Sequence, residues 1–130
     1  MLPRTRARKH ALDILHAADA LDRPVAEVLA DEPGVKEFTR EIVLGVIEHR
    51  EELDDLIRRY ADRWVLERMP IVDRNLLRMG IFELLHRDDI PPAATINEAV
   101  ELAKLLSTED SGRFVNGLLG RVAREHAEPI

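Results

Sequence analysis

Residues 75–85 read NLLRMGIFELL, and their apolar side chains cover more than half of the circumference of a helix. A helix with so wide an apolar surface needs neighbours on several sides, so we expect it to lie at the centre of the fold. Pro70 precedes it, at a place where proline is tolerated near a helix start. Gly80 in its middle costs about 1 kcal/mol relative to alanine unless a neighbouring backbone approaches closely there. The stretch therefore predicts a central helix entered at Pro70.

Amphipathic helices are predicted before this segment as well. Apolar residues recur every three or four positions over residues 5–21, which predicts a first helix. A short second helix is expected to end before the Pro-Gly pair at 33–34. An apolar stripe then runs through residues 35–64, and EHREE at 48–52 is its only interruption. Periodicity alone leaves open whether this stripe forms one long helix or two.

The remaining segments also predict helices. RDDIPPAA at 87–94 is expected to be a loop, because consecutive prolines do not fit inside a helix. Thr95 and Glu98 have the spacing of a capping box and predict a helix over 95–106. After a turn, the last helix is expected to run to about residue 125. The whole chain is therefore predicted to be all-α.

The composition supports this class. The 130 residues are the size of one domain, so we expect residues 1–130 to form a single domain. Charged residues make up 34% and aromatic residues 4%, which favours helices around an aliphatic core over a sheet. The absence of cysteine excludes disulfides and thiolate ligands. The longest apolar run, at 42–47, is far shorter than the ~20 residues that span a bilayer, so we expect a cytoplasmic protein with no membrane partner.

No pattern in the sequence indicates catalysis. The histidines lack the tight spacing of metal ligands, and there is neither a glycine-rich phosphate loop nor a GxSxG motif. The acidic stretch at 48–55 is typical of a solvated helix face. We therefore expect no enzyme activity, no metal and no cofactor.

The segment RTRARKH at 4–10 is the densest positive patch of a chain whose net charge is −6. Positive side chains are unfavourable at the N-terminus of a helix, which itself carries partial positive charge. They are therefore poorly placed to stabilise the helix, and with the free backbone N–H groups there they are suited to bind a polyanion. A solvated helix end explains the same pattern, and the sequence of this segment alone does not choose between the two.

One face of the last helix combines charge and aromaticity. It groups arginines with an aromatic ring and a glycine, opposite the apolar core face: Asp110, Arg113, Phe114, Gly117, Arg121 and Arg124. Arginine beside an aromatic ring is the pairing that binds single-stranded RNA, since the cation meets phosphate and the ring stacks on a base. Taken alone, this face is explained more simply as an ordinary surface with Phe114 at the edge of the core. Both basic surfaces would be one site if the fold brings the termini together.

Several motifs together resemble the NusB family of bacterial transcription antitermination factors. They are INEAVELAK at 96–104, EDSGRFVNGLLGR at 109–121, RNLLRMGIFELL at 74–85, RARKHALDIL at 6–15 and VLGVIEHREELDDLI at 43–57. The resemblance covers essentially the whole chain. It implies a compact domain of seven helices, three in an N-terminal and four in a C-terminal subdomain, with a break near EHREE.

The resemblance also implies function. Proteins of this family pair with NusE, a small-subunit ribosomal protein, and the heterodimer binds boxA sequences of nascent single-stranded RNA. The complex then joins the RNA polymerase antitermination complex, notably in ribosomal RNA operons. Members of the family are monomers or homodimers, and a homodimer that buried the arginine-rich helix would mask the RNA site. No catalysis is involved.

Specific residues are implied by position. The RNA-binding set comprises Arg4, Arg6, Arg8, Lys9, Asp110, Arg113, Phe114, Asn116 and Arg121. Within it, Phe114 stacks on a base, Arg113 meets phosphate and Asn116 forms hydrogen bonds, whereas the negative charge of Asp110 weakens the attraction. The partner-binding set comprises Glu67, Asp73 and Arg74.

Two other interpretations remain beside antitermination. One is a helical protein–protein adaptor whose RNA surface is weak or unused. The other is an accessory RNA-binding domain like those appended to some ribosomal RNA methyltransferases, although the chain has no room for the methyltransferase fold itself. RNA binding that a partner enhances and salt weakens would favour antitermination over the adaptor.

Overall fold

A computed structural model describes residues 1–62 and 64–126 and folds them into seven α-helices and one turn of 3₁₀-helix. In chain order these are α1 (Pro3–Leu21), α2 (Val25–Asp31), α3 (Glu37–Glu48), α4 (Arg50–Tyr60), η1 (Leu66–Arg68), α5 (Ile71–His86), α6 (Pro92–Leu106) and α7 (Glu109–His126). The described residues contain no strand, so the all-α prediction is confirmed. None of their helices is long and apolar enough to cross a bilayer.

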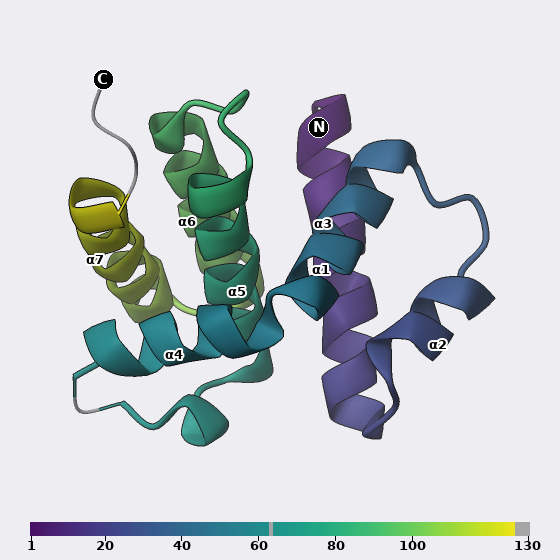
Figure 1. Cartoon of the computed structure of the whole chain (residues 1–130), viewed down its shortest axis with the longest axis horizontal. Helices are drawn as coiled ribbons and strands as arrows, with labels where there is room; N and C mark the ends of the chain where they lie inside the picture. The colour runs from purple at the N-terminus through teal and green to yellow at the C-terminus, as the bar shows by residue number, and fades with distance from the viewer. Residues whose placement is uncertain (63, 127–130) are drawn as a thin grey trace.

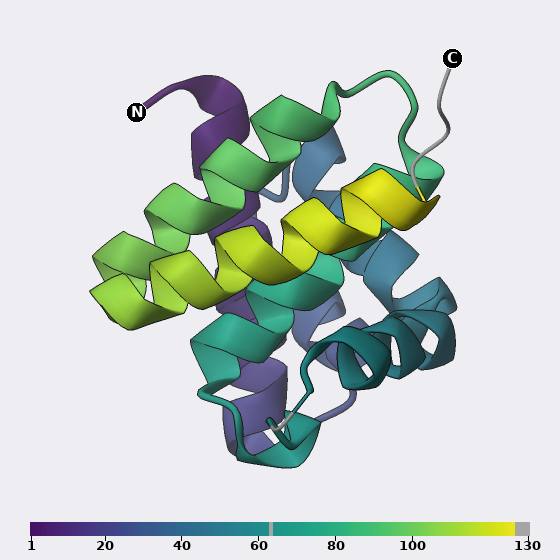
Figure 2. The same cartoon turned by 90° about the vertical axis from the view of Figure 1, so that its left-hand side faces the viewer.

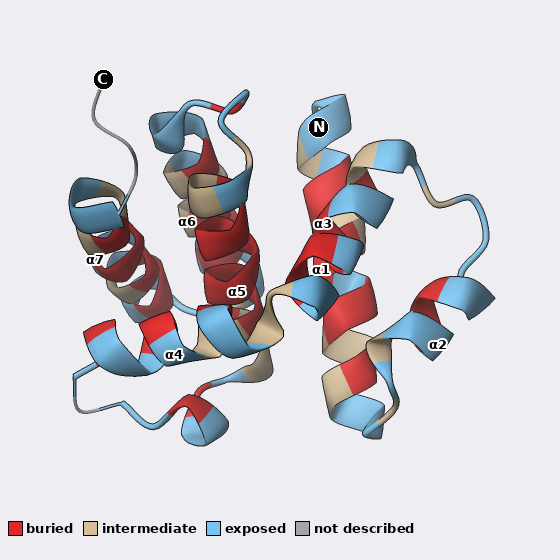
Figure 3. Cartoon of the chain, in the orientation of Figure 1, coloured by how far each residue is buried: buried red, intermediate tan, exposed pale blue. Residues whose placement is uncertain are grey.

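The helix predicted from the apolar stretch at 75–85 occupies the centre of the fold. α5 packs against α1, α3, α4, α6 and α7 (Figure 1). Every residue from Asn75 to Glu83 is buried, which gives α5 the longest buried segment in Figure 3. Gly80 allows α7 to approach closely, because a Cβ placed there would lie 2.7 Å from Cδ1 of Leu119. The close neighbour is thus a side chain of α7.

The helices form two groups, as the resemblance implied. Figure 1 shows α1, α2 and α3 together on one side and α4 to α7 on the other. The stripe at 35–64 is two helices, since α3 ends at Glu48 and α4 begins at Arg50. His49 lies between them with φ −106° and ψ 16°, outside helical geometry. The expected break near EHREE is therefore confirmed.

The predicted capping box is wrong. α6 begins at Pro92, because a proline in the first turn needs no N–H partner and its φ already suits a helix. Thr95 therefore lies inside the helix, where its hydroxyl donates a 2.8 Å hydrogen bond to Oε1 of Glu83. Glu98 instead accepts hydrogen bonds from Thr5 and Arg8 of α1. Both residues join α6 to other helices and cap nothing.

An ion network fastens the two groups of helices to each other. Asp19 of α1 accepts hydrogen bonds from Asn75, at 2.9 Å, and from Arg74 and Arg78 of α5, at 3.2 Å each. Arg78 also donates to Asp54 of α4 at 2.8 Å. Burial alone raises the pKa of Asp19, but these donors and the positive charges lower it below its usual value overall. The network therefore holds α1, α4 and α5 with an ionised carboxylate.

Candidate nucleic-acid interface

The first turns of α1 and the start of α3 enclose an N-terminal hollow of about 430 Å³. Its lining residues are Pro3, Arg4, Arg6, Ala7, His10, Gly34, Lys36, Phe38 and Thr39. Arg4 and Arg6, both predicted for RNA, are exposed here, and Lys36 adds a third exposed cation. The hollow therefore gathers positive charge from two helices, which suits an anionic ligand.

Phe38 organises the arginines at this hollow. The guanidinium carbon of Arg4 lies 4.4 Å from the centre of the Phe38 ring, and those of Arg8 and Arg87 lie 5.1 and 5.4 Å from it. Such cation–π contacts stabilise the arginines against an apolar surface. Phe38 thus holds Arg4 beside Lys36. No sequence pattern indicated this role, because Phe38 fits the apolar stripe at 35–64 like its other members.

Arg8 corrects the predicted RNA-binding set. It is only 5% exposed, and its Nε and Nη2 donate to Oε2 and Oε1 of Glu83 at 2.9 and 2.8 Å. Its Nη1 donates to Glu98 at 3.0 Å. Burial alone lowers the pKa of Arg8, but the hydrogen bonds and charge of Glu83, with those of Glu98, raise it overall. Because the guanidinium is buried and held in these pairs, a phosphate in solvent cannot reach it, so Arg8 positions α1 instead.

Lys9 lies outside the hollow. Its Nζ forms a 3.0 Å ion pair with Asp13, one turn further along α1. Lys9 is partly exposed and Asp13 is exposed, and a surface pair at this spacing is weak and easily exchanged. Lys9 is therefore available to a passing phosphate, although it does not line the hollow.

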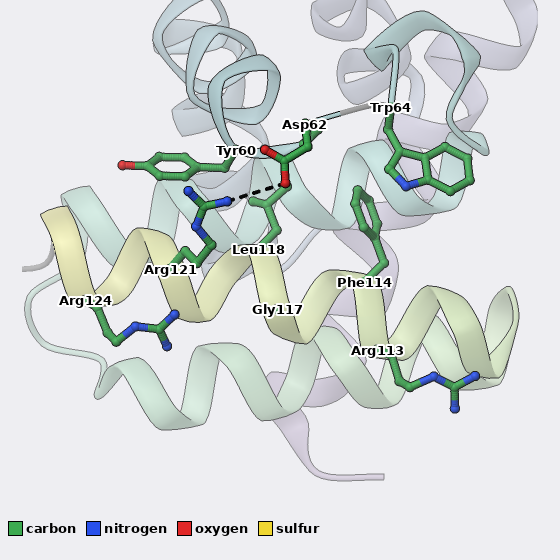
Figure 4. A pocket seen from close by; sticks show the side chains of 10 residues that line it. Tyr60, Asp62, Trp64, Arg113, Phe114, Gly117, Leu118, Arg121 and Arg124 are labelled. Carbon is green, nitrogen blue, oxygen red and sulfur yellow. Dashed lines mark ion pairs between the residues drawn. The ribbon is translucent and has the colours of Figure 1, made fainter.

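A second surface, the α7 groove, lies between α7 and the segment that follows α4. Its volume is about 560 Å³, and it is lined by Tyr60, Ala61, Asp62, Trp64, Arg113, Phe114, Gly117, Leu118, Arg121 and Arg124. Figure 4 shows Phe114 and Arg121 rising from α7 toward Asp62 and Trp64, with Arg113 and Arg124 on the other side of the helix. The arginine and aromatic face predicted for the last helix is therefore solvent-accessible.

Arg121 is held in the middle of the α7 groove. Its Nη1 lies 3.7 Å from Oδ2 of Asp62, and its guanidinium carbon lies 4.8 Å from the centre of the Tyr60 ring. Asp62 is exposed and has φ 56°, in the left-handed region that aspartate tolerates better than most residues. The backbone turn after α4 thus presents a carboxylate to Arg121.

Trp64 is the residue of this groove that sequence reasoning missed. The apolar stripe placed it at the end of a helix facing the core, but it follows α4 and is 58% exposed. Its ring lies beside that of Phe114, with centroids 5.7 Å apart and planes 53° apart. Phe114 is half-buried and packs against the core. Trp64 therefore rests on a supported ring.

The other predicted residues of α7 lie around the groove. Asp110 forms an ion pair with Arg113, and both are exposed. Asn116 is exposed but does not line the groove. Arg124 does line it, and within the described residues it has no ion-pair partner. The sequence placed Arg124 on this face without assigning it to RNA.

The two basic surfaces are separate. Figures 1 and 2 both show α6 between the first turns of α1 and the whole of α7. Thr5 and Arg8 of α1 contact Glu98 of α6, and α6 packs against α7 on its other side. The expectation that the chain ends would form one continuous site therefore needs correction. A ligand that used both surfaces would have to pass over α6.

Of the three predicted partner residues, Asp73 lines a smaller hollow of about 200 Å³, the α5 hollow. It is lined by Trp64, Met69, Pro70, Asp73, Ser107, Thr108, Asp110, Ser111 and Phe114. Asp73 is buried, and its Oδ2 accepts a 2.7 Å hydrogen bond from Ser111. Within the described residues its Oδ1 is the buried side-chain atom left without a hydrogen-bond partner. A buried carboxylate oxygen in this state is suited to receive a donor from outside.

Glu67 and Arg74 lie near the same end of α5 but are engaged differently. Glu67 is exposed and accepts a 2.8 Å hydrogen bond from Arg58. This bond, with a backbone hydrogen bond, lowers the pKa of Glu67 despite a small opposing effect of desolvation. Arg74 is half-buried and bonded to Asp19 and to the carbonyl of Glu67. Of these two residues, Glu67 is therefore the one whose charged group is exposed to solvent, as part of a surface ion pair with Arg58.

A histidine cluster is the arrangement closest to a metal site among the described residues. Ligand atoms of His49, Glu52 and His86 lie within 4.8 Å of one another, which their spacing in the sequence did not reveal. The two imidazoles are stacked, with centroids 3.8 Å apart and planes 14° apart. In-plane lone pairs of stacked rings run side by side and do not converge on one ion. Glu52 instead forms a 2.8 Å hydrogen bond with Nε2 of His86 and lies 3.5 Å from Nδ1 of His49.

Comparison with known proteins places these surfaces in a family context. Residues 5–124 match the family model described as the NusB family. The transcription antitermination protein NusB of Saccharopolyspora erythraea is 50% identical over 92% of this chain and 86% of its own length. The solved structure of T. maritima NusB has a TM-score of 0.88 at 40% identity, over 98% of this chain and 94% of that one. A structure of the antitermination factors NusB and NusE in complex with double-stranded RNA has a TM-score of 0.81 at 26% identity, over 95% of this chain and 98% of the matched one.

Proposed function

Because the chain belongs to the NusB family, we propose that it acts as a transcription antitermination factor that binds RNA together with a NusE partner. The observation that carries this proposal is the α7 groove, where arginine side chains and three aromatic rings line one accessible surface. Such a combination recognises unpaired bases by stacking and phosphates by charge. The N-terminal hollow, with Arg4, Arg6 and Lys36, supplies a second contact for the RNA backbone.

The RNA ligand that fits these surfaces best is the single-stranded boxA type. Stacking on Phe114 requires a base that is not paired within a duplex. The separation of the two surfaces by α6 favours a flexible strand, because a strand can bend over the helix between two contacts. In this proposal Arg4, Arg6 and Lys9 meet the backbone at one end. Residues Arg113, Phe114, Asn116 and Arg121 meet the RNA at the other, and Arg8 supports α1 from within.

The NusE partner is proposed to dock at the α5 hollow. The unpaired Oδ1 of Asp73 offers a buried acceptor to a cationic side chain, and Glu67 offers an exposed carboxylate nearby. Arg74 contributes by holding the backbone of Glu67 in place. A partner that brings positive charge is attracted to these acids and to the chain's net charge of −6. The α5 hollow therefore favours a basic protein surface.

Partner binding also accounts for RNA binding by an acidic protein. Most of the surface repels phosphate, so the chain alone binds RNA only through two local patches. A basic partner seated next to the α7 groove adds positive charge where the RNA passes, since Trp64 and Phe114 line both the groove and the α5 hollow. The proposed assembly then joins RNA polymerase during transcription of ribosomal RNA operons in the cytoplasm. Catalysis has no part in this mechanism.

Matched variants test the proposal. The affinity of the NusE complex for labelled boxA-type RNA should fall about fivefold at low salt for Arg6→Ala and more for Phe114→Ala. Arg23→Ala is the control, because Arg23 follows the opposite end of α1 and is also exposed. Equal affinities for all four proteins would support a helical adaptor instead. Light scattering at the same concentrations shows whether the chain forms a homodimer.

A further inference from the structure

We propose that the indole of Trp64 is a stacking platform for one unpaired nucleobase of the bound RNA, in a subsite shared with Phe114 and Arg121. The proposal rests on the RNA-binding function proposed above and adds a residue to it. Trp64 is the single tryptophan of the chain, and it is 58% exposed although tryptophan is strongly buried in most proteins.

The indole is supported from below. Phe114 packs against the core and tilts its ring against Trp64 at a centroid distance of 5.7 Å. The backbone N–H of Trp64 donates a 3.1 Å hydrogen bond to the carbonyl of Ala61, which closes the turn after α4. At 5.7 Å the two rings leave no room for a base between them, so a base stacks on the outer side of the indole. Because the indole is already held on one side, it loses little conformational entropy when a base stacks on it.

The charges around Trp64 favour nucleic acid over a basic protein. Arg113, Arg121 and Arg124 line the same groove, and Arg121 is held by Asp62 and by the Tyr60 ring. Figure 4 shows Arg121 on the same side of α7 as Phe114, so the groove sets a guanidinium beside aromatic rings, as binding of a single strand requires. On the groove side of Trp64, Arg121 repels a cationic group and attracts a phosphate next to a stacked base.

The alternative occupant is the protein partner, because Trp64 also borders the α5 hollow with Met69 and Pro70. The two assignments make different predictions. A stacked base would change RNA affinity and the fluorescence of the indole when RNA is added. A contact with the partner would change the affinity for NusE in the absence of RNA.

The test compares Trp64→Ala and Trp64→Phe with the unchanged chain, each in complex with its NusE partner. Trp64→Ala is expected to weaken binding of labelled boxA-type RNA about tenfold, while Trp64→Phe, which keeps a ring, stays within about threefold. The affinity for NusE without RNA should be unchanged in both. Circular dichroism and urea unfolding establish that the variants fold. Single-stranded RNA should also quench the Trp64 fluorescence of the chain without its partner, and the same RNA annealed to its complement should quench it less.

The outcomes separate this inference from the proposed function. If the unchanged complex binds RNA and Arg6→Ala weakens it, but Trp64→Ala does not, the stacking subsite is wrong and the function stands. If Trp64→Ala weakens NusE binding but the assembled complex keeps its affinity for RNA, Trp64 belongs to the partner interface. If the unchanged complex does not bind RNA at all, both proposals are overturned.

Discussion

The guanidinium of Arg8 and the carboxylate of Glu83 form two parallel hydrogen bonds, 2.9 and 2.8 Å long, inside the protein. The pair joins α1 to the central helix α5, and Thr95 of α6 donates to the same carboxylate at 2.8 Å. Three helices thus meet at one buried charge pair. Arg8 also lies 5.1 Å from the ring of Phe38, which in turn holds Arg4 at the N-terminal hollow. The pair therefore positions the arginines that remain exposed.

Removing Arg8 should destabilise the fold. Arg8→Ala leaves the Glu83 carboxylate buried without its cation, which typically costs about 3–5 kcal/mol. Urea unfolding at pH 7 measures the loss. The double variant Arg8→Met with Glu83→Leu removes both charges and should recover a large part of it. A loss below about 1 kcal/mol for Arg8→Ala would show that the pair does not hold α1 to α5.

Neutralising Asp110 should tighten RNA binding. Asp110 is exposed and paired with Arg113, so Asp110→Asn removes a negative charge and releases a guanidinium for phosphate. We expect an increase of about two- to fivefold in the RNA affinity of the NusE complex at low salt. Asp55→Asn on α4 makes the same charge change at another exposed ion pair and is the control. An equal increase in both variants would assign the effect to net charge alone.

Stability should depend on the ionisation of Asp19. The pKa of Asp19 in the folded protein is below its usual value of 3.8, so the folded state binds this proton less readily than the unfolded state. Its stabilising effect is complete above about pH 4 and disappears as the pH falls through the lower, folded pKa. Asp19→Asn should therefore cost about 1–3 kcal/mol at pH 7. Urea unfolding in steps from pH 7 to pH 3 should show this difference shrinking below pH 4; a constant difference would contradict the assignment.

The charge of Asp73 should control the affinity for the NusE partner in the absence of RNA. Asp73→Asn preserves the shape and a possible bond to Ser111 but removes the charge of the unpaired oxygen. The affinity for NusE, measured by calorimetry without RNA, should fall about tenfold or more. Glu27→Gln is a control for the lost charge, because Glu27 is exposed on α2 in the other group of helices. The partner site lies elsewhere if Asp73→Asn and Glu27→Gln bind NusE equally well.

The sequence predicted the helices well because helical periodicity is a local property. Residues 75–85 alone indicated a central helix, and every residue from Asn75 to Glu83 is indeed buried. The capping box at 95–98 failed for a reason that is not local, since its two polar side chains bond to α1 and α5. Pro92 was the better signal for the helix start, because its fixed φ suits the first turn.

The site residues were harder to predict because their roles depend on distant neighbours. Arg8 belonged to a basic segment, yet Glu83, 75 positions away, buries it. Phe38 and Lys36 join the N-terminal hollow only after α3 packs on α1. Trp64 matched the apolar stripe at 35–64, so the sequence assigned it to the core. Helix α4 ends at Tyr60, one turn before Trp64, and the indole is exposed. Phe114 and Arg121 were correctly placed on one face, because a single helix sets their spacing.

The most direct test of the central claim is the affinity for boxA-type RNA, measured with and without the NusE partner over a series of salt concentrations. We predict that the partner strengthens binding and that the logarithm of the affinity falls linearly with the logarithm of salt concentration. The slope should be about −0.7 for each phosphate neutralised, and Arg6→Ala should reduce its magnitude by about that amount. RNA affinity that is independent of both the partner and salt would contradict the claim that two basic surfaces and a docked NusE form the RNA site.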